Sequence, residues 1–318
     1  MIVQVVLIIL GFILLIKGAD FLVDGSSKIA KKFHIPEIII GLTIVSIGTS
    51  MPELFVSITS AIEGYPDMAV GNVIGSNLCN LLLILGLSAV IQAIEFKKET
   101  RLIEIPMTLF VTIILFVLCN IGTDITRGEG ILLIVLFVWF IIYTIYMGKK
   151  GEEFENKDVL VEVQTDKKYS TIKSIFWIIL GIIGLKIGGD LVVNHSVTIA
   201  KALNISEKII SLTIIAIGTS LPELVTSVTA AFKGDSDIAI GNILGSNIFN
   251  ILLILGVSSV ITPIKYSVSY NNQILVLIIG TILLALFPFI GAKNKMTRTN
   301  GFAYLVIYAI YMIGLFIV

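Results

Sequence analysis

Residues 41–90 read GLTIVSIGTSMPELFVSITSAIEGYPDMAVGNVIGSNLCNLLLILGLSAV, and residues 211–260 read SLTIIAIGTSLPELVTSVTAAFKGDSDIAIGNILGSNIFNILLILGVSSV. The two stretches align without a gap at a constant offset of 170 residues, and 29 of the 50 positions are identical. Such self-similarity indicates a duplicated structural unit. The same offset pairs residues outside the stretches, namely Gly18 with Gly188, Asp20 with Asp190, Ser26 with Ser196 and Glu37 with Glu207. We therefore expect each half of the chain to be one complete copy.

Both copies are dominated by long apolar runs. The mean hydropathy is +1.03, and only 14% of the residues are charged, against about 25% in soluble domains. With about 20 residues for each membrane-spanning helix, the chain has room for roughly ten spans. The expected spans are 1–23, 38–62, 68–92, 103–121, 128–147, 172–193, 208–232, 238–262, 271–290 and 300–318.

Composition excludes several classes of protein. The first run, Met1 to Ile16, has no basic start and no small-residue cleavage site, so a retained first helix is expected and not a signal peptide. The 22 basic and 22 acidic residues balance, which gives no reason to expect a nucleic-acid partner. Cys79 and Cys119 both fall inside expected spans, so a disulfide framework is not supported. A His-Glu-x-x-His metalloenzyme motif is absent, and we expect neither an enzyme nor a cofactor.

The number of spans determines how the copies are oriented. Five spans for each copy is an odd number, so the second copy must enter the membrane from the opposite side, as an inverted repeat. With the spans placed so, sixteen Lys and Arg residues collect on one side and four on the other. The positive-inside rule then places the polar linker 148–171 in the cytoplasm and both termini outside. The expected units are 1–147, the linker 148–171, and 172–318.

Each copy carries a glutamate near the middle of an apolar span, Glu53 in the first and Glu223 in the second. An ionised carboxylate there costs at least about 2.5–3.5 kcal/mol. The basic residues inside spans, Lys17 and Lys186, lie on other helices and near their ends. The natural compensating charge is therefore a cation that binds and leaves.

Other oxygen-bearing side chains accompany each glutamate at spacings of three and four, which places them along one helical face. In the second span these are Ser46, Thr49, Ser50, Glu53 and Ser57, with Ala216, Thr219, Ser220, Glu223 and Ser227 as their counterparts. The third span adds Asn72, Ser76 and Asn80, and the eighth adds Asn242, Ser246 and Asn250. Carboxylate, hydroxyl, amide and carbonyl oxygens are the ligands that Ca2+ prefers.

Proline makes backbone oxygen available as well. Pro52 has no N–H for the carbonyl of Gly48, and Pro222 likewise frees that of Gly218. Paired helix breaks in corresponding positions of two halves indicate a transport site.

These residues resemble a known family. Gly48-Thr49-Ser50-Met51-Pro52-Glu53 with Gly75-Ser76-Asn77, and their duplicates 218–223 and 245–247, are similar to the two signatures of the sodium/calcium exchanger family of the Ca2+:cation antiporter superfamily. The resemblance covers essentially the whole chain and is to a prokaryotic member. It implies an all-α membrane protein of ten helices in two inverted halves, with helices 2, 3, 7 and 8 broken around an ion site at mid-membrane.

The resemblance also implies a set of ligands for the transported ions. Glu53 and Glu223 would hold Ca2+ and, alternately, Na+. Completing the set would be the carbonyls of Thr49, Thr219, Ser46 and Ala216, the hydroxyls of Ser50, Ser220, Ser76 and Ser246, and the amides of Asn80 and Asn250. Some archaeal and K+-dependent relatives have Asp at the position of Asn250, so coupling to K+ is not favoured.

Charge balance suggests how Na+ and Ca2+ would be coupled. Two carboxylates are neutralised by one Ca2+ or by two Na+, and a third Na+ would make the cycle electrogenic. A loaded site can then switch sides of the membrane, whereas two bare charges cannot. The expected substrates are Ca2+ and Na+, in a monomer that needs the lipid bilayer but no protein partner. Alternatives that stay open are a Ca2+/H+ antiporter, a K+-dependent exchanger and a Ca2+ channel.

The remaining ionisable residues carry less information. His34 and His195 fall in expected loops and have no carboxylate or cysteine cluster around them in the sequence, so neither a metal role nor an acid-base role is expected. Asp20 and Asp190 lie near the ends of the first and sixth expected spans. We expect both to be solvated carboxylates at helix ends, with a role in gating or ion entry as the alternative.

Overall fold

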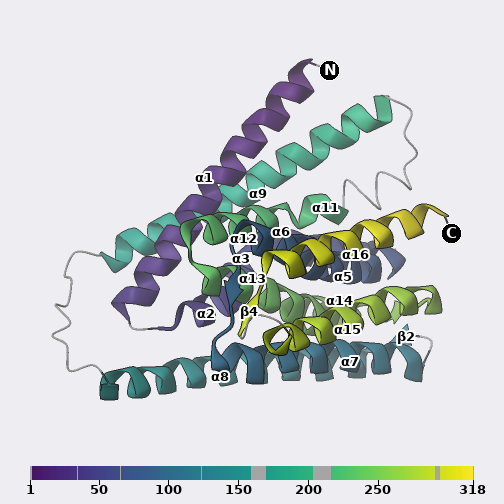
Figure 1. Ribbon diagram of the computed structural model, residues 1–318. Coiled ribbons are helices and arrows are strands. Elements are labelled where there is room, and N and C mark those ends of the chain that lie inside the picture. Colours follow the sequence, from purple (N-terminus) through teal and green to yellow (C-terminus); the bar gives the residue numbers. More distant parts are fainter. Residues whose placement is uncertain are drawn as a thin grey trace.

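The computed structural model describes residues 2–33, 35–64, 66–122, 124–158, 170–202, 216–290 and 294–317. Nearly all of these residues are helical (Figure 1). This confirms the all-helical class expected from the apolar runs.

The first half contains the following elements. They are α1 (Ile2–Lys32), α2 (Glu37–Ile40), the π-helix η1 (Gly41–Val45), α3 (Ser46–Thr49), α4 (Met51–Glu63), α5 (Pro66–Leu78), the π-helix η2 (Cys79–Ile84), α6 (Leu85–Ile91), β1 (Ile94–Glu95), the π-helix η3 (Thr100–Glu104), α7 (Ile105–Ile121), β2 (Asp124–Ile125) and α8 (Arg127–Asp158). Helix α1, helix α8 and, in the second half, the helix Thr171–Ala202 each run about ten residues beyond their expected spans, so His195 lies in a helix and not in the expected loop. The length of an apolar run predicts how much of a helix lies in the membrane, but the helix itself can continue into the polar layer beyond the run.

The second half contains a matching series. Its elements are α9 (Thr171–Ala202), α11 (Ala216–Thr219), α12 (Leu221–Lys233), α13 (Ser236–Phe249), the π-helix η5 (Asn250–Ile254), α14 (Leu255–Ile261), β3 (Ile264–Lys265), the 3-10 helix η6 (Val268–Tyr270), α15 (Asn271–Leu286), the 3-10 helix η7 (Phe287–Phe289), β4 (Lys295–Met296) and α16 (Arg298–Ile317).

Among the described residues, seven helices are long and apolar enough to cross a membrane, and a bent pair, Glu37–Thr49 with Met51–Ile62, raises the number to eight. The expected span 208–232 begins outside the described residues, and only α11 and α12 of it are seen. Helix α16 occupies the place of the tenth expected span. The count of ten helices therefore stays a prediction.

The helix breaks are fewer than expected. The axis bends by 50° between α3 and α4, at Ser50, and Ser220 between α11 and α12 has nearly the same backbone angles. The third and eighth spans, by contrast, are continuous, and their irregularity is confined to the π-helical turns η2 and η5. The prediction of four broken helices is thus wrong for these two. No proline interrupts them after Pro66, so no backbone N–H is missing from their hydrogen-bond ladders.

Helices α1 and α9 lie along each other and project from the rest of the bundle (Figure 1). Glycines allow this close approach: a Cβ on Gly18 would meet the Gly181 carbonyl oxygen at 2.8 Å, and one on Gly188 would meet that of Gly11 at 2.7 Å. Small residues commonly let membrane helices pack this closely.

The core lies around the third and eighth spans. Every residue of α13 from Ile238 onward is buried, and the α5–η2–α6 span is the next most buried. Helix α13 crosses the first half at a glycine contact, where a Cβ on Gly241 would meet the carbonyl oxygen of Ile38 at 2.6 Å. The two halves therefore pack against each other through helices that carry the duplicated sequence.

Two short antiparallel ladders also join the halves. Strand β1 pairs with β4, and β2 pairs with β3. Next to each ladder an arginine donates to a backbone carbonyl, Arg127 to Ile261 and Arg298 to Ile91. Both kinds of contact recur at an offset of 170 or 171 residues, so the duplication in sequence is matched by duplicated contacts.

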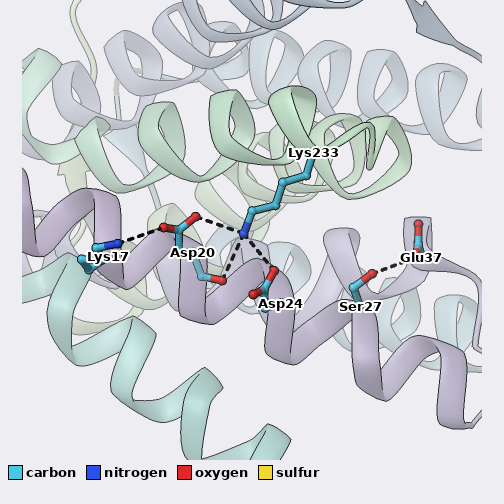
Figure 2. Close-up of polar contacts among 6 residues, drawn as sticks. All are labelled: Lys17, Asp20, Asp24, Ser27, Glu37 and Lys233. Atoms are coloured by element: carbon cyan, nitrogen blue, oxygen red, sulfur yellow. Dashed lines mark hydrogen bonds and ion pairs between the residues drawn. The ribbon is translucent and has the colours of Figure 1, made fainter. Parts of the chain in front are cut away.

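A cluster of ionic groups attaches α1 to the end of α12 (Figure 2). The Lys233 ammonium lies 3.0 Å from an Asp20 carboxylate oxygen and 2.8 Å from one of Asp24, and Lys17 lies 3.9 Å from Asp20. Asp20 is therefore inside a long helix and ion-paired, so the expectation of a solvated helix-end carboxylate was wrong. Asp190 also lies within its helix, α9, and is exposed.

Candidate ion-binding site

The helix breaks place both glutamates at helix N-termini inside the protein. Glu53 lies in the first turn of α4, directly after the break at Ser50, and Glu223 lies in the first turn of α12, after the break at Ser220. Both side chains are completely buried. The partial positive charge of a helix N-terminus favours a carboxylate, so each break helps to hold the charge that follows it.

Serine hydroxyls cross between the halves to reach these carboxylates. Ser50 Oγ donates to Glu223 Oε1 at 2.6 Å, and Ser220 Oγ donates to Glu53 Oε1 at 3.3 Å. Longer contacts come from each glutamate's own half, from Ser76 to Glu53 at 3.4 Å and from Ser246 to Glu223 at 3.5 Å. The four serines and both glutamates thus form one buried cluster, made by residues of both halves.

Two asparagines outside the predicted ligand set hold the breaks in place. Asn72 Nδ2 donates to the Glu53 carbonyl at 3.2 Å and to Ser57 Oγ at 2.9 Å, and Asn242 repeats both contacts with Glu223 and Ser227. Their Oδ1 atoms accept from threonines of the other half, Thr219 for Asn72 and Thr49 for Asn242. The four-residue spacing had indicated that these asparagines face the site, but it could not show this bracing role.

Several oxygens of the cluster are buried without a protein partner among the described residues. They are Glu53 Oε2, Glu223 Oε2, Asn80 Oδ1, Asn247 Oδ1 and Asn250 Oδ1. Lys17 and Lys186, the basic residues within the spans, are exposed on α1 and α9. A buried carboxylate oxygen without a hydrogen-bond partner or a nearby positive charge costs free energy. The arrangement is therefore suited to binding a cation, which supplies the positive charge that the basic side chains do not.

The remaining predicted ligands differ in their burial and in whether their oxygens already accept hydrogen bonds. The Ser46 carbonyl already accepts from the Ser50 N–H at 3.0 Å and from Thr49 Oγ1 at 3.3 Å. Ala216 is the first residue of α11, and residues 203–215, which precede it, are not among the described residues. Asn80 and Asn250 are fully buried at the start of the π-helical turns η2 and η5.

The donor atoms indicate the kind of ion. Within the described ranges, no group of three or more His, Cys, Asp or Glu side chains gathers into a metal site. Two carboxylates with neutral hydroxyl and amide oxygens favour hard cations such as Na+ and Ca2+ over transition metals. Fold and site together define a multi-pass helical membrane protein with a polar cluster at its centre.

The comparison with protein families then identifies the chain. The family model described as sodium/calcium exchanger protein matches residues 3–146 and 173–317. The chain belongs to the sodium/calcium exchanger family, a family of ion antiporters, as the paired signatures had indicated.

Relatives and solved structures agree with this family. The chain is 30% identical to the sodium/calcium exchanger MaX1 of Methanosarcina acetivorans, over 99% of each protein. It is 36% identical to the inner membrane protein YrbG of Escherichia coli, over 89% of each. A structure of the sodium-calcium exchanger NCX_Mj, soaked with Na+ and Ca2+, superimposes with a TM-score of 0.85 at 34% identity and covers 99% of both chains.

Proposed function

We propose that this protein exchanges Na+ for Ca2+ across a cell membrane by alternating access. The observation that carries the proposal is the pair of fully buried glutamates, each with one oxygen that has no partner within the described ranges of the chain. The names of MaX1 and NCX_Mj, which state this exchange for those proteins, support it.

The proposed ligands for the ions are those of the buried cluster. Glu53 and Glu223 supply charge, and the amide oxygens of Asn80 and Asn250, to which no described group donates, supply neutral donors. The hydroxyls of Ser50, Ser220, Ser76 and Ser246 already point at the carboxylates. They can turn their oxygens to a cation, because a hydroxyl both donates and accepts. The carbonyls of Thr49, Thr219, Ser46 and Ala216 complete the set.

Charge balance gives the coupling. One Ca2+ or two Na+ neutralise the two carboxylates, and a third Na+ leaves one net positive charge on the loaded site. Each net charge that crosses with the membrane potential contributes about 2.3 kcal/mol per 100 mV. With a negative interior, the entry of Na+ therefore drives Ca2+ out of the cell.

For the architecture we propose ten helices in two inverted halves, 1–147 and 172–318, joined by a cytoplasmic linker 148–171 and with both termini outside. The duplicated contacts support this, because the β1–β4 and β2–β3 ladders and their neighbouring arginines recur at the offset of the sequence repeat. The uneven distribution of Lys and Arg supports the orientation.

Purified protein in liposomes tests the proposal. With a Na+ gradient imposed, the wild type should accumulate 45Ca2+, and Glu53→Gln and Glu223→Gln should each abolish this flux, because one carboxylate cannot neutralise Ca2+. Glu99→Gln, an exposed glutamate outside the cluster, should transport as the wild type does. Full activity of either buried variant would exclude the site.

A buried carboxylate with an unpartnered oxygen can also take up a proton, so Ca2+/H+ exchange is the second candidate. The same liposomes separate the two. Flux that follows a Na+ gradient at equal pH on both sides supports Na+ coupling, and flux that follows only a pH gradient supports the alternative.

A further inference from the structure

Beside the glutamates, α5 and α13 are joined by a reciprocal pair of asparagines. Asn77 Nδ2 donates to the backbone carbonyl of Asn247 at 3.2 Å, and Asn247 Nδ2 donates to that of Asn77 at 3.4 Å. Both side chains are buried. These two residues are not ligands in the proposed set, and they occupy equivalent places in the two halves.

The bond from Asn77 sets the direction of a third amide. A carbonyl oxygen can only accept, so Asn77 must turn its Nδ2 toward Asn247 and its Oδ1 the other way. That Oδ1 accepts from Asn250 Nδ2 at 2.9 Å. Asn250 therefore presents its nitrogen to Asn77, and its own Oδ1 stays buried without a protein partner among the described residues.

The first half lacks this arrangement, although its residues are the same. Asn80 is the counterpart of Asn250, and Asn247 is the counterpart of Asn77. Yet neither amide atom of Asn80 has a hydrogen-bond partner in the described part of the chain, and neither does Asn247 Oδ1. Asn250 is thus fixed in one orientation, whereas the amide of Asn80 is held by no such bond.

We propose that Asn77 is a positioning residue for ion binding: it orients the Asn250 amide so that the oxygen, and not the nitrogen, faces the transported cation. The inference rests on the proposed function and adds to it a residue that acts only through another. The physical reason is that an amide oxygen attracts a cation, whereas the NH2 end of the same group repels it. An amide left free to rotate must lose that freedom each time an ion binds.

The two equivalent asparagines give a matched pair of variants. Asn77→Ala and Asn247→Ala each remove one buried side chain and one bond to a backbone carbonyl across the α5–α13 contact. Only Asn77→Ala also releases Asn250. In Na+-driven 45Ca2+ uptake we expect Asn77→Ala to raise the half-saturating Ca2+ concentration roughly three- to tenfold more than Asn247→Ala does, the equivalent of one hydrogen bond. The maximal rate should stay near that of the wild type.

A second background separates positioning from packing. In Asn250→Asp both ends of the side chain are oxygen, so nothing remains to be oriented. Adding Asn77→Ala to Asn250→Asp should leave the half-saturating Ca2+ concentration unchanged or lower it, because a carbonyl oxygen is removed from beside a carboxylate. A loss of affinity as large as in the wild-type background, or equal effects of Asn77→Ala and Asn247→Ala, would overturn the proposal.

A readout without transport keeps this test separate from that of the exchange reaction. Ca2+ alone, added to protein in detergent, should raise the unfolding temperature of the wild type. The Ca2+ concentration that gives half of this rise should be higher for Asn77→Ala than for Asn247→Ala, as in the uptake assay. If Na+ fails to drive flux but this order holds, exchange is wrong and the positioning role stands. Should Asn77→Ala not be recovered folded, Asn77→Ser serves instead, because a hydroxyl is too short to reach both partners.

Discussion

Ser50 is the residue through which the first half contacts the charge of the second. Its hydroxyl makes the shortest contact to either glutamate, 2.6 Å to Glu223 Oε1. Ser50 is also the N-cap residue of α4, at the break between α3 and α4. One side chain therefore links the local backbone of one half to the chemistry of the other.

Ser50→Ala should weaken Ca2+ binding by roughly tenfold, because it removes a proposed ligand oxygen that can turn to the cation, and a polar contact with a charged group contributes about 1.5–3 kcal/mol. Half-saturation of Na+-driven 45Ca2+ uptake measures this. Thr112→Ala is the control, since that buried hydroxyl donates to the carbonyl of Thr108 in its own helix, away from the glutamates. Equal effects of the two substitutions would show that burial of a hydroxyl, and not its contact with Glu223, is what matters.

Short stretches of backbone position the charged side chains. At both breaks a serine leaves the helix and a proline follows two residues later, which starts a new helix with the glutamate in its first turn. The π-helical turns in the neighbouring spans hold Asn80 and Asn250. At these two breaks and two π-helical turns the irregular backbone lies inside the protein, beside buried polar side chains.

The ionic cluster in Figure 2 joins elements of different halves, and the sequence repeat does not duplicate its residues. Its lysine, Lys233, corresponds to Glu63 in the first half, and Asp24 corresponds to Asn194. A glutamate cannot form an ion pair with Asp190, the counterpart of Asp20. Helix α1 is therefore tied to the second half by a contact that the symmetry of the repeat does not provide for α9.

Lys233→Met should lower the unfolding temperature by roughly 1–3 °C, since a partly exposed ion pair contributes about 0.5–1 kcal/mol. Burial lowers the pKa of Lys233, but its bonds to Asp24 and Asp20 outweigh this, and the pKa lies above its usual value. The stabilisation is then complete below the usual value of about 10.4 and is lost as pH rises through the raised one. The difference from the wild type should stay constant from pH 6 to 9 in thermal unfolding. Lys17→Met, which removes only the 3.9 Å pair, should change little.

At the scale of the whole molecule, the two halves enclose one site between them. Each half supplies one carboxylate, and each carboxylate takes a hydroxyl from the other half. A change that moves one half relative to the other must therefore remake the site, which is what alternating access requires of a transporter.

Transport should respond to membrane voltage. If three Na+ exchange for one Ca2+, an imposed potential of 100 mV should shift the final Ca2+ gradient by roughly fiftyfold, which is 2.3 kcal/mol expressed as a ratio. Liposomes clamped with K+ and valinomycin at fixed Na+ gradients measure this shift. A final gradient that does not depend on voltage would indicate two Na+ for each Ca2+.

The sequence alone determined the class of fold, the duplication and the two central glutamates, because apolar length and a charge within it are properties of single stretches of chain. It overestimated the helix breaks, since the third and eighth spans carry their irregularity as π-helical turns, for which the sequence has no signal comparable to proline. Bonds between the halves, such as Ser50 to Glu223, appeared only in the folded structure.

The asparagines show the limit most clearly. Positions 77 and 247 are identical in type, as are 80 and 250, so the sequence assigns both halves the same role. Tertiary structure makes them different, because Asn250 reaches Asn77 while Asn80 forms no such bond with Asn247. Hydrogen bonds depend on the relative position of two helices to within a fraction of an ångström, and packing alone decides that distance.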